Sequence, residues 1–212
     1  MELQARVRGK KKSFTDIDIA FQPNLILLNV QCLNIDKVNQ LHVMVSDYAR
    51  VKFFCLTETW ATAESLNNFV IGNFQLVSSY FRSSYKGGGL VIYCRNDVVA
   101  KPIDVSQFSL DKNIELCAIQ FSNGGIRSII ILCYRSPSGD MKIFHDNLNR
   151  ALNFVFRPNI NIILCGDFNV DSYNGLHPQV GWPTRIGRTS ITTIHQVFTN
   201  FNDKCLNSLL IM

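Results

Sequence analysis

The chain has 212 residues, which is enough for one domain with a substantial hydrophobic core. Lysine and arginine total 21 against 16 acidic residues, so the net charge of +5 is compatible with a polyanionic partner without requiring one. No apolar stretch approaches the roughly 20 residues of a membrane span, and the N-terminus lacks a signal-peptide core. We therefore expect a nuclear or cytoplasmic protein that is not secreted, has no membrane partner and is a monomer.

Seven cysteines are scattered through the chain, and none has the Cys-x-x-Cys spacing of a zinc site. Most lie inside apolar runs, which predicts free, buried thiols in a reducing compartment.

A basic run, Arg6–Lys12, lies within an N-terminal segment, residues 1–22, that has only weak periodicity. We expect a flexible, solvated arm. A phosphate-contacting or nuclear-targeting role is the alternative. Residues 24–212 show neither an internal repeat nor a second domain.

The first part of this domain predicts a strand, a helix and a second strand. Leu25–Val30 and Val51–Thr57 are continuous apolar runs typical of buried strands, and Ile35–Tyr48 has apolar residues at helical spacing. This order indicates a crossover unit that joins parallel strands.

The remaining predicted elements follow with clear turn signals between them. A triple glycine, Gly87-Gly88-Gly89, precedes one strand and has no P-loop spacing, so a turn or close packing is expected. A helix over Met141–Phe156 should be capped by Asp140 or Ser138. The expected strands are Phe74–Ser78, Leu90–Cys94, Glu115–Phe121, Ile126–Tyr134, Ile160–Cys165, Ile194–Phe198 and Leu206–Ile211, and the helix is Met141–Phe156.

Four of the predicted strands end in polar residues. Each tip alone has an ordinary explanation as a solvated or rim residue, but four in one chain suggest convergence at one end of a sheet. The oxygen atoms there suit a hard cation, and Mg²⁺ is the natural candidate because it takes one or two carboxylates plus substrate phosphate. The tips are Asn29 with Gln31, Glu58, Tyr134 with Arg135, and Asp167 with Asn169.

The motifs at these tips resemble those of the endonuclease/exonuclease/phosphatase superfamily. More narrowly, they resemble the apurinic-like endonuclease domain of non-LTR (LINE-type) retrotransposons, over about residues 24–212. The segments that carry the resemblance are Leu28-Asn29-Val30-Gln31, Leu56-Thr57-Glu58-Thr59-Trp60, Gly87–Tyr93, Tyr134-Arg135-Ser136-Pro137 and Gly166-Asp167-Phe168-Asn169.

The resemblance implies an α/β fold, a four-layered sandwich of two packed sheets flanked by helices. It implies a DNA endonuclease that uses Mg²⁺ (or Mn²⁺), with Glu58 holding the metal beside Asn29 and Asp167 activating the attacking water. It further implies that Asn169 positions the scissile phosphate, that Tyr134 donates to a phosphate oxygen, and that Arg135 contacts phosphate or DNA. The partner would be DNA, and a reverse transcriptase could belong to the same polyprotein.

Three departures from the family pattern affect this expectation. The stretch between Asn169 and Pro183-Thr184-Arg185 is shorter than usual. His195 stands where the family has an aspartate, and we assign it only a doubtful role. The family closes with Ser-Asp-His on a last strand, which is missing before the end at Met212, so we expect a C-terminally truncated domain of impaired activity.

Two alternatives to an active endonuclease remain open. One is a non-catalytic nucleic-acid-binding remnant that uses the basic arm, and the other is a superfamily phosphatase acting on a lipid or a small molecule.

Overall fold

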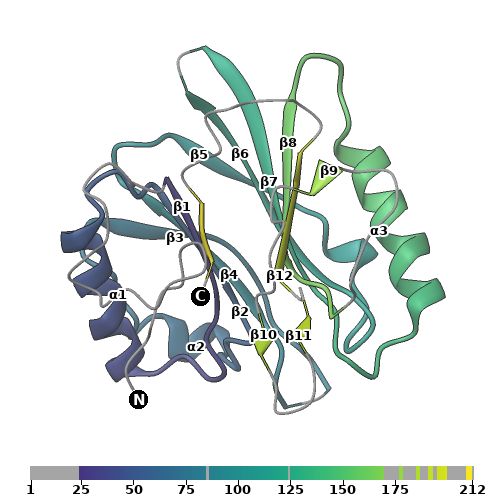
Figure 1. Ribbon diagram of the computed structural model, residues 1–212, viewed down its shortest axis with the longest axis horizontal. Coiled ribbons are helices and arrows are strands. Elements are labelled where there is room, and N and C mark those ends of the chain that lie inside the picture. The colour runs from purple at the N-terminus through teal and green to yellow at the C-terminus, as the bar shows by residue number, and fades with distance from the viewer. Residues whose placement is uncertain are drawn as a thin grey trace.

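The computed structural model describes residues 24–84, 86–123 and 125–169, together with strands at 177–178, 185–186, 191–192, 195–199 and 209–211. Two β-sheets pack face to face, with helix α1 outside one and helix α3 outside the other (Figure 1). This α/β four-layered sandwich confirms the predicted fold class. The expected N-terminal arm, residues 1–22, lies outside the described residues.

The crossover unit forms as predicted at the start of the domain. Strand β1 (Leu25–Asn29) and strand β2 (Phe53–Thr57) pair in parallel, and helix α1 (Ile35–Asp47) connects them. Asn34 caps α1 by accepting a hydrogen bond from the Lys37 amide at 3.0 Å. The helix buries Val38, Leu41 and Met44 against the sheet.

The first sheet has the strand order β13-β1-β2-β4-β3. Its other strands are β3 (Phe74–Tyr80), β4 (Leu90–Arg95) and β13 (Leu209–Ile211). Helix α2 (Ala63–Leu66) follows β2. It was not predicted, because four residues are too few to show helical periodicity.

The second sheet has the order β5-β6-β7-β8-β12-β9, and β10 pairs with β11 separately. Asp140 caps helix α3 by accepting from the Ile143 amide at 2.9 Å, as one of the two predicted caps. The elements are β5 (Ala100–Ile103), a 3₁₀ turn (Ser106–Phe108), β6 (Glu115–Asn123), β7 (Ile126–Tyr134), α3 (Met141–Val155), β8 (Asn161–Asp167), β9 (His177–Pro178), β10 (Arg185–Ile186), β11 (Ile191–Thr192) and β12 (His195–Thr199).

Three apolar layers hold the sandwich together. One lies between α1 and the first sheet, a second lies between the two sheets, and a third lies between the second sheet and α3. The described cysteines are free thiols, and all of them except Cys32 are buried in these layers, which confirms the expectation for them. Burial raises the pKa of thiols such as Cys117 and Cys133, so they are protonated packing residues.

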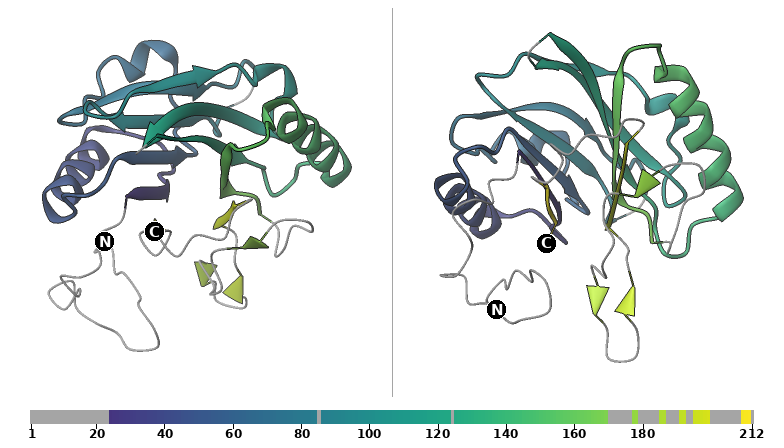
Figure 2. Two further views of the ribbon diagram at one scale, coloured as in Figure 1. Left: turned by 90° about the horizontal axis from the view of Figure 1, so that it is seen from above. Right: turned by 45° about the horizontal axis from the view of Figure 1, so that its top comes forward.

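The parallel pairs decide where the site can form. In β1/β2 and in β7/β8 the strands run the same way, so their carboxyl ends meet at one edge of each sheet. Figure 2 shows the two sheets stacked from other directions. None of the helices within the described ranges is long and apolar enough to cross a membrane.

Candidate functional site

One amide side chain links the tips of three strands. Asn29 Nδ2, at the end of β1, donates to Glu58 Oε1 at 2.8 Å and to Asp167 Oδ2 at 2.9 Å. Glu58 follows β2 of the first sheet directly, whereas Asp167 ends β8 of the second sheet. The structure therefore brings three of the predicted site residues together across the interface between the sheets.

The loop after Asn29 is also held from behind. The Gln31 amide donates to Asn29 Oδ1 at 3.2 Å. The Lys37 ammonium donates to the three successive carbonyls of Val30, Gln31 and Cys32, at 2.6 Å for Gln31 and 3.1 Å for Cys32. Lys37 thus fixes the backbone that orients Asn29, a contact that helical periodicity alone gave no reason to expect.

Gly166 explains how Asp167 reaches this position. A Cβ atom at Gly166 would lie 1.8 Å from the backbone carbonyl oxygen of Cys133, so only glycine fits against the neighbouring strand. The close approach sets the register of β8 on β7, in which Asp167 lies opposite Tyr134. Asp167 is buried, with 1% of its surface exposed.

Tyr134 adds a hydroxyl donor to the cluster. Burial raises the pKa of Tyr134 well above its usual value, and the charges of Glu58 and Asp167 and a hydrogen bond to Glu58 raise it further. The nearby Arg82 guanidinium lowers this pKa, but by less than the other causes raise it. Tyr134 is therefore a neutral phenol at physiological pH, able to donate a proton in a hydrogen bond but unsuited to act as a base.

A buried ion pair lies behind Tyr134. Arg82 Nε donates to Glu115 Oε1 at 2.6 Å, and the two side chains are 7% and 0% exposed. The Arg82 guanidinium carbon lies 5.8 Å from the centre of the Tyr134 ring. Burial raises the pKa of Glu115, whereas the Gly89 amide and Arg82 lower it. Sequence reasoning missed this pair, because Arg82 lies after a strand and Glu115 at the start of another, with no local signal that they meet.

The triple glycine packs over this ion pair and holds the loop that carries Glu58. The Gly89 amide donates to Glu115 Oε2 at 2.6 Å. Gly89 and Gly88 in turn accept from the Thr59 and Trp60 amides at 3.2 and 2.9 Å. The predicted close-packing role of the glycines is confirmed, since a Cβ at Gly88 would lie 2.3 Å from Arg82 Nε.

Arg135 and Asn169 support each other beside the cluster. Asn169 Nδ2 donates to the Arg135 carbonyl at 2.7 Å. The Arg135 side chain is buried and donates to the carbonyls of Gly139 at 2.9 Å and Asn169 at 3.3 Å. In this arrangement the guanidinium of Arg135 braces the loop after β8, and its expected contact with phosphate stays a prediction.

His195 begins strand β12, whose backbone pairs with β8 so that His195 lies opposite Asp167. The sequence assigned this residue only a doubtful role, and its register places it at the edge where the other site residues meet.

The side chains suit a hard divalent cation. The carboxylates of Glu58 and Asp167 both accept from the Asn29 side-chain amide, whose own oxygen is a third possible ligand. Mg²⁺ needs only one or two protein carboxylates, because water and substrate phosphate complete its shell. No group of three or more His, Cys, Asp or Glu residues that could hold a metal occurs in the described part of the chain.

Comparisons with known proteins agree with this architecture. Similar solved structures include the endonuclease domain of TRAS1, a telomere-specific non-LTR retrotransposon (TM-score 0.61, 13% identity, 82% of each chain covered). They also include D. rerio TDP2 with a single-stranded DNA product (0.59, 13%, 82% of each chain) and a mannosyl-6-phosphatase of Bacteroides thetaiotaomicron (0.57, 14%, 84% of this chain and 85% of that one). At these identities the likeness shows the fold alone.

No curated protein matches the chain. The model of the endonuclease/exonuclease/phosphatase family matches residues 26–200, which include every strand tip described above. The chain therefore belongs to the endonuclease/exonuclease/phosphatase family, whose members are hydrolases of phosphate esters.

Proposed function

We propose that this chain is a divalent-metal-dependent endonuclease that hydrolyses phosphodiester bonds in DNA. The observation that carries the proposal is the hydrogen-bonded set of Asn29, Glu58 and Asp167, which joins three strand ends at one edge of the sandwich. Glu58 and Asp167 share one amide donor, and holding two like charges this close together is costly unless a ligand of opposite charge offsets their repulsion.

Each residue then has a distinct chemical role. Asp167, buried at the strand tip, would accept the proton of the attacking water, while Tyr134 would donate a hydrogen bond to a phosphate oxygen as negative charge develops. Asn169 would position the phosphate beside them. Asn29 fixes the positions of the Glu58 and Asp167 carboxylates relative to each other by donating to both.

Glu58, with Asn29 beside it, would hold Mg²⁺ or Mn²⁺, which when bound stabilises negative charge on the phosphate as a Lewis acid.

DNA is the proposed substrate for two reasons. The motifs at Glu58, Tyr134 and Asp167 resemble those of retrotransposon endonuclease domains, and the net charge of +5 is compatible with a polyanionic substrate. The similar solved structures include an endonuclease domain and a protein bound to a DNA product, which supports this choice. A phosphatase also shares the fold, so the test must separate diesters from monoesters.

The experiment is a nicking assay on supercoiled plasmid with Mg²⁺ or with EDTA, run beside hydrolysis of a phosphomonoester. The proposal predicts Mg²⁺-dependent nicking that is lost in Asp167→Ala and Glu58→Ala, and little monoester hydrolysis. Lys142→Ala, at an exposed position of α3, is the matched control and should nick normally.

Equal background nicking in all four proteins would refute the endonuclease. Retained DNA binding with a steep salt dependence would then favour a non-catalytic binding role, and preferred monoester hydrolysis would favour a phosphatase.

A further inference from the structure

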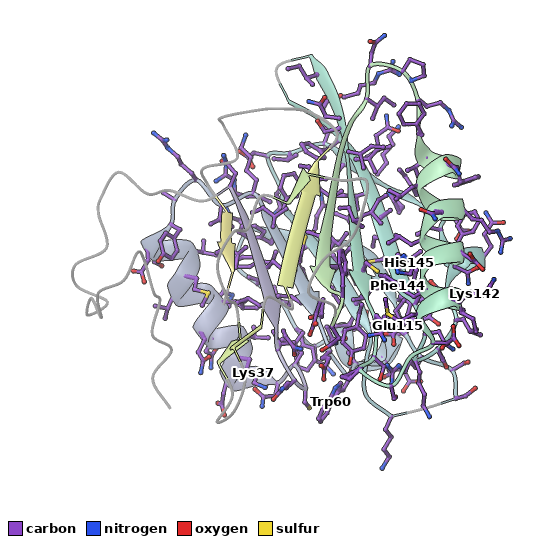
Figure 3. All side chains as sticks on the ribbon, turned by 45° about the vertical axis from the view of Figure 1, so that its right-hand side comes forward. Lys37, Trp60, Glu115, Lys142, Phe144 and His145 are labelled. Carbon is purple, nitrogen blue, oxygen red and sulfur yellow. The ribbon has the colours of Figure 1, made fainter. Side chains whose placement is uncertain are left out.

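Trp60 lies two residues beyond Glu58 and is 51% exposed. In Figure 3 it projects at the lower rim of the molecule, whereas Glu115 and Phe144 lie within it. Two residues of backbone span at most about 7 Å, so the Cα atom of Trp60 lies near that of Glu58.

The backbone of Trp60 is unusual for an exposed apolar residue. Its φ is +52°, in the left-handed region, which bulky residues rarely adopt. Among the described residues with large, exposed hydrophobic side chains, Trp60 is the only one with a positive φ. Strain of this kind persists only where the surroundings impose it, and it clusters at ligand-binding sites.

The surroundings that impose the conformation are on the neighbouring glycine loop. The Trp60 amide donates to the Gly88 carbonyl at 2.9 Å. A Cβ at Gly87 would lie 3.6 Å from the indole nitrogen and 3.7 Å from Arg82 Nη1, so the loop packs beside the ring and the guanidinium. Since Arg82 is itself fixed by the buried Glu115, the Trp60 ring lies beside a rigid part of the structure.

We propose that Trp60 is a stacking platform for a nucleobase of the substrate strand, so that the chain takes polynucleotides with at least one unstacked base beside the cleaved bond. Every base has a π-face, so such a platform strengthens binding without selecting a sequence. The backbone span of at most about 7 Å between Glu58 and Trp60 corresponds to roughly two nucleotides of a strand at about 3.4 Å of rise per nucleotide.

This inference rests on the proposed function, because it assumes that a phosphodiester of the same strand occupies the site. It goes beyond that function by naming the chemical feature of the strand, a base, that is recognised next to the phosphate. Phosphate contacts alone would not distinguish a nucleic acid from another polyanion.

The test compares two fluorescently labelled 12-mers, a single-stranded oligodeoxynucleotide and an abasic strand with the same number of phosphates. Binding is measured by anisotropy in EDTA, so that no cleavage occurs. Wild type should bind the base-bearing strand more tightly. Trp60→Ala should bind it roughly 5- to 100-fold more weakly, with no change for the abasic strand, and Trp60→Phe should restore most of the loss.

Phe156→Ala is the matched control, because this exposed aromatic follows α3 at the other end of β8 from Asp167 and should change neither affinity. A second readout uses Trp182→Phe, which leaves Trp60 as the sole tryptophan. Its fluorescence should be quenched by the oligonucleotide and not by the abasic strand.

Equal affinity of wild type and Trp60→Ala for the base-bearing strand would overturn the inference, as would an equal loss on both strands. These outcomes are separate from failure of the proposed function. A protein that shows Trp60-dependent base binding but no Mg²⁺-dependent nicking would keep the stacking platform and refute the endonuclease.

Discussion

The buried pair of Arg82 and Glu115 gives a quantitative prediction. Removing one partner of a buried ion pair costs about 3–5 kcal/mol, because the remaining charge is left in a site of low polarity. The Glu115 side chain is 0% exposed, so Arg82→Met should lower the free energy of unfolding by about that amount. Glu115→Gln keeps an oxygen for the Gly89 amide but leaves Arg82 without its counter-charge.

The double variant Arg82→Met/Glu115→Gln buries neither charge. It should therefore be more stable than Arg82→Met alone, by about 2 kcal/mol, which is within the range of coupling energies for residues in direct contact. Urea unfolding followed by circular dichroism gives the free energy of unfolding of all three variants, fitted with a common dependence on urea concentration. Lys142→Met is the control, since Lys142 and its partner Asp146 are both exposed and solvent screens their attraction.

Additive effects of the two single substitutions would contradict this prediction, because they would mean that the stabilities contributed by the two charges do not depend on each other. A loss of stability in Lys142→Met as large as that in Arg82→Met would refute it as well.

Three further predictions concern the strand tips and the core. Gly166→Ala should destabilise the chain by more than about 3 kcal/mol or prevent folding, because its Cβ would lie 1.8 Å from the Cys133 carbonyl oxygen. Gly125→Ala, whose Cβ would have no atom within 4 Å, should cost only about 1–2 kcal/mol. Thermal melts compare the two variants. Asn29→Ala should lower the nicking rate about 100-fold at saturating Mg²⁺, since both carboxylates lose their shared donor, and an unchanged rate in single-turnover kinetics would contradict this. Burial raises the pKa of Tyr93 from 10.0 to about 12, so the folded state holds this proton more tightly and the free energy of unfolding falls as pH rises from 10 to 12. Tyr93→Phe should reduce that fall by about 2–3 kcal/mol, measured by urea unfolding at pH 9 and pH 12. Equal falls in the two proteins would argue against this.

Much of the architecture could be predicted from the sequence, because its elements carry strong periodic signals. The continuous apolar runs at Leu25–Asn29 and Phe53–Thr57 are buried parallel strands, and the helix over Met141–Val155 has apolar residues at regular helical spacing. Strand β5, which includes Pro102, was missed because proline and short length are weak strand signals, although an edge strand tolerates both.

The site was predictable only in part. Polar residues directly after apolar runs marked Asn29, Glu58 and Asp167, and parallel pairing brought these ends together. The pairing of Arg82 with Glu115 depends on how the two sheets stack, which no local pattern encodes. Likewise, the burial of Arg135 follows from the loop that folds around it, and a motif cannot distinguish a bracing arginine from one that meets substrate.

We propose that the linked strand tips form a phosphodiester-hydrolysing centre. The most direct measurement is the single-turnover nicking rate of a supercoiled plasmid at saturating Mg²⁺ for wild type and Asp167→Asn, which keeps the shape of the side chain and removes its charge. We expect a rate at least about 100-fold lower for Asp167→Asn with an unchanged melting temperature. Equal nicking rates for the two proteins would contradict it.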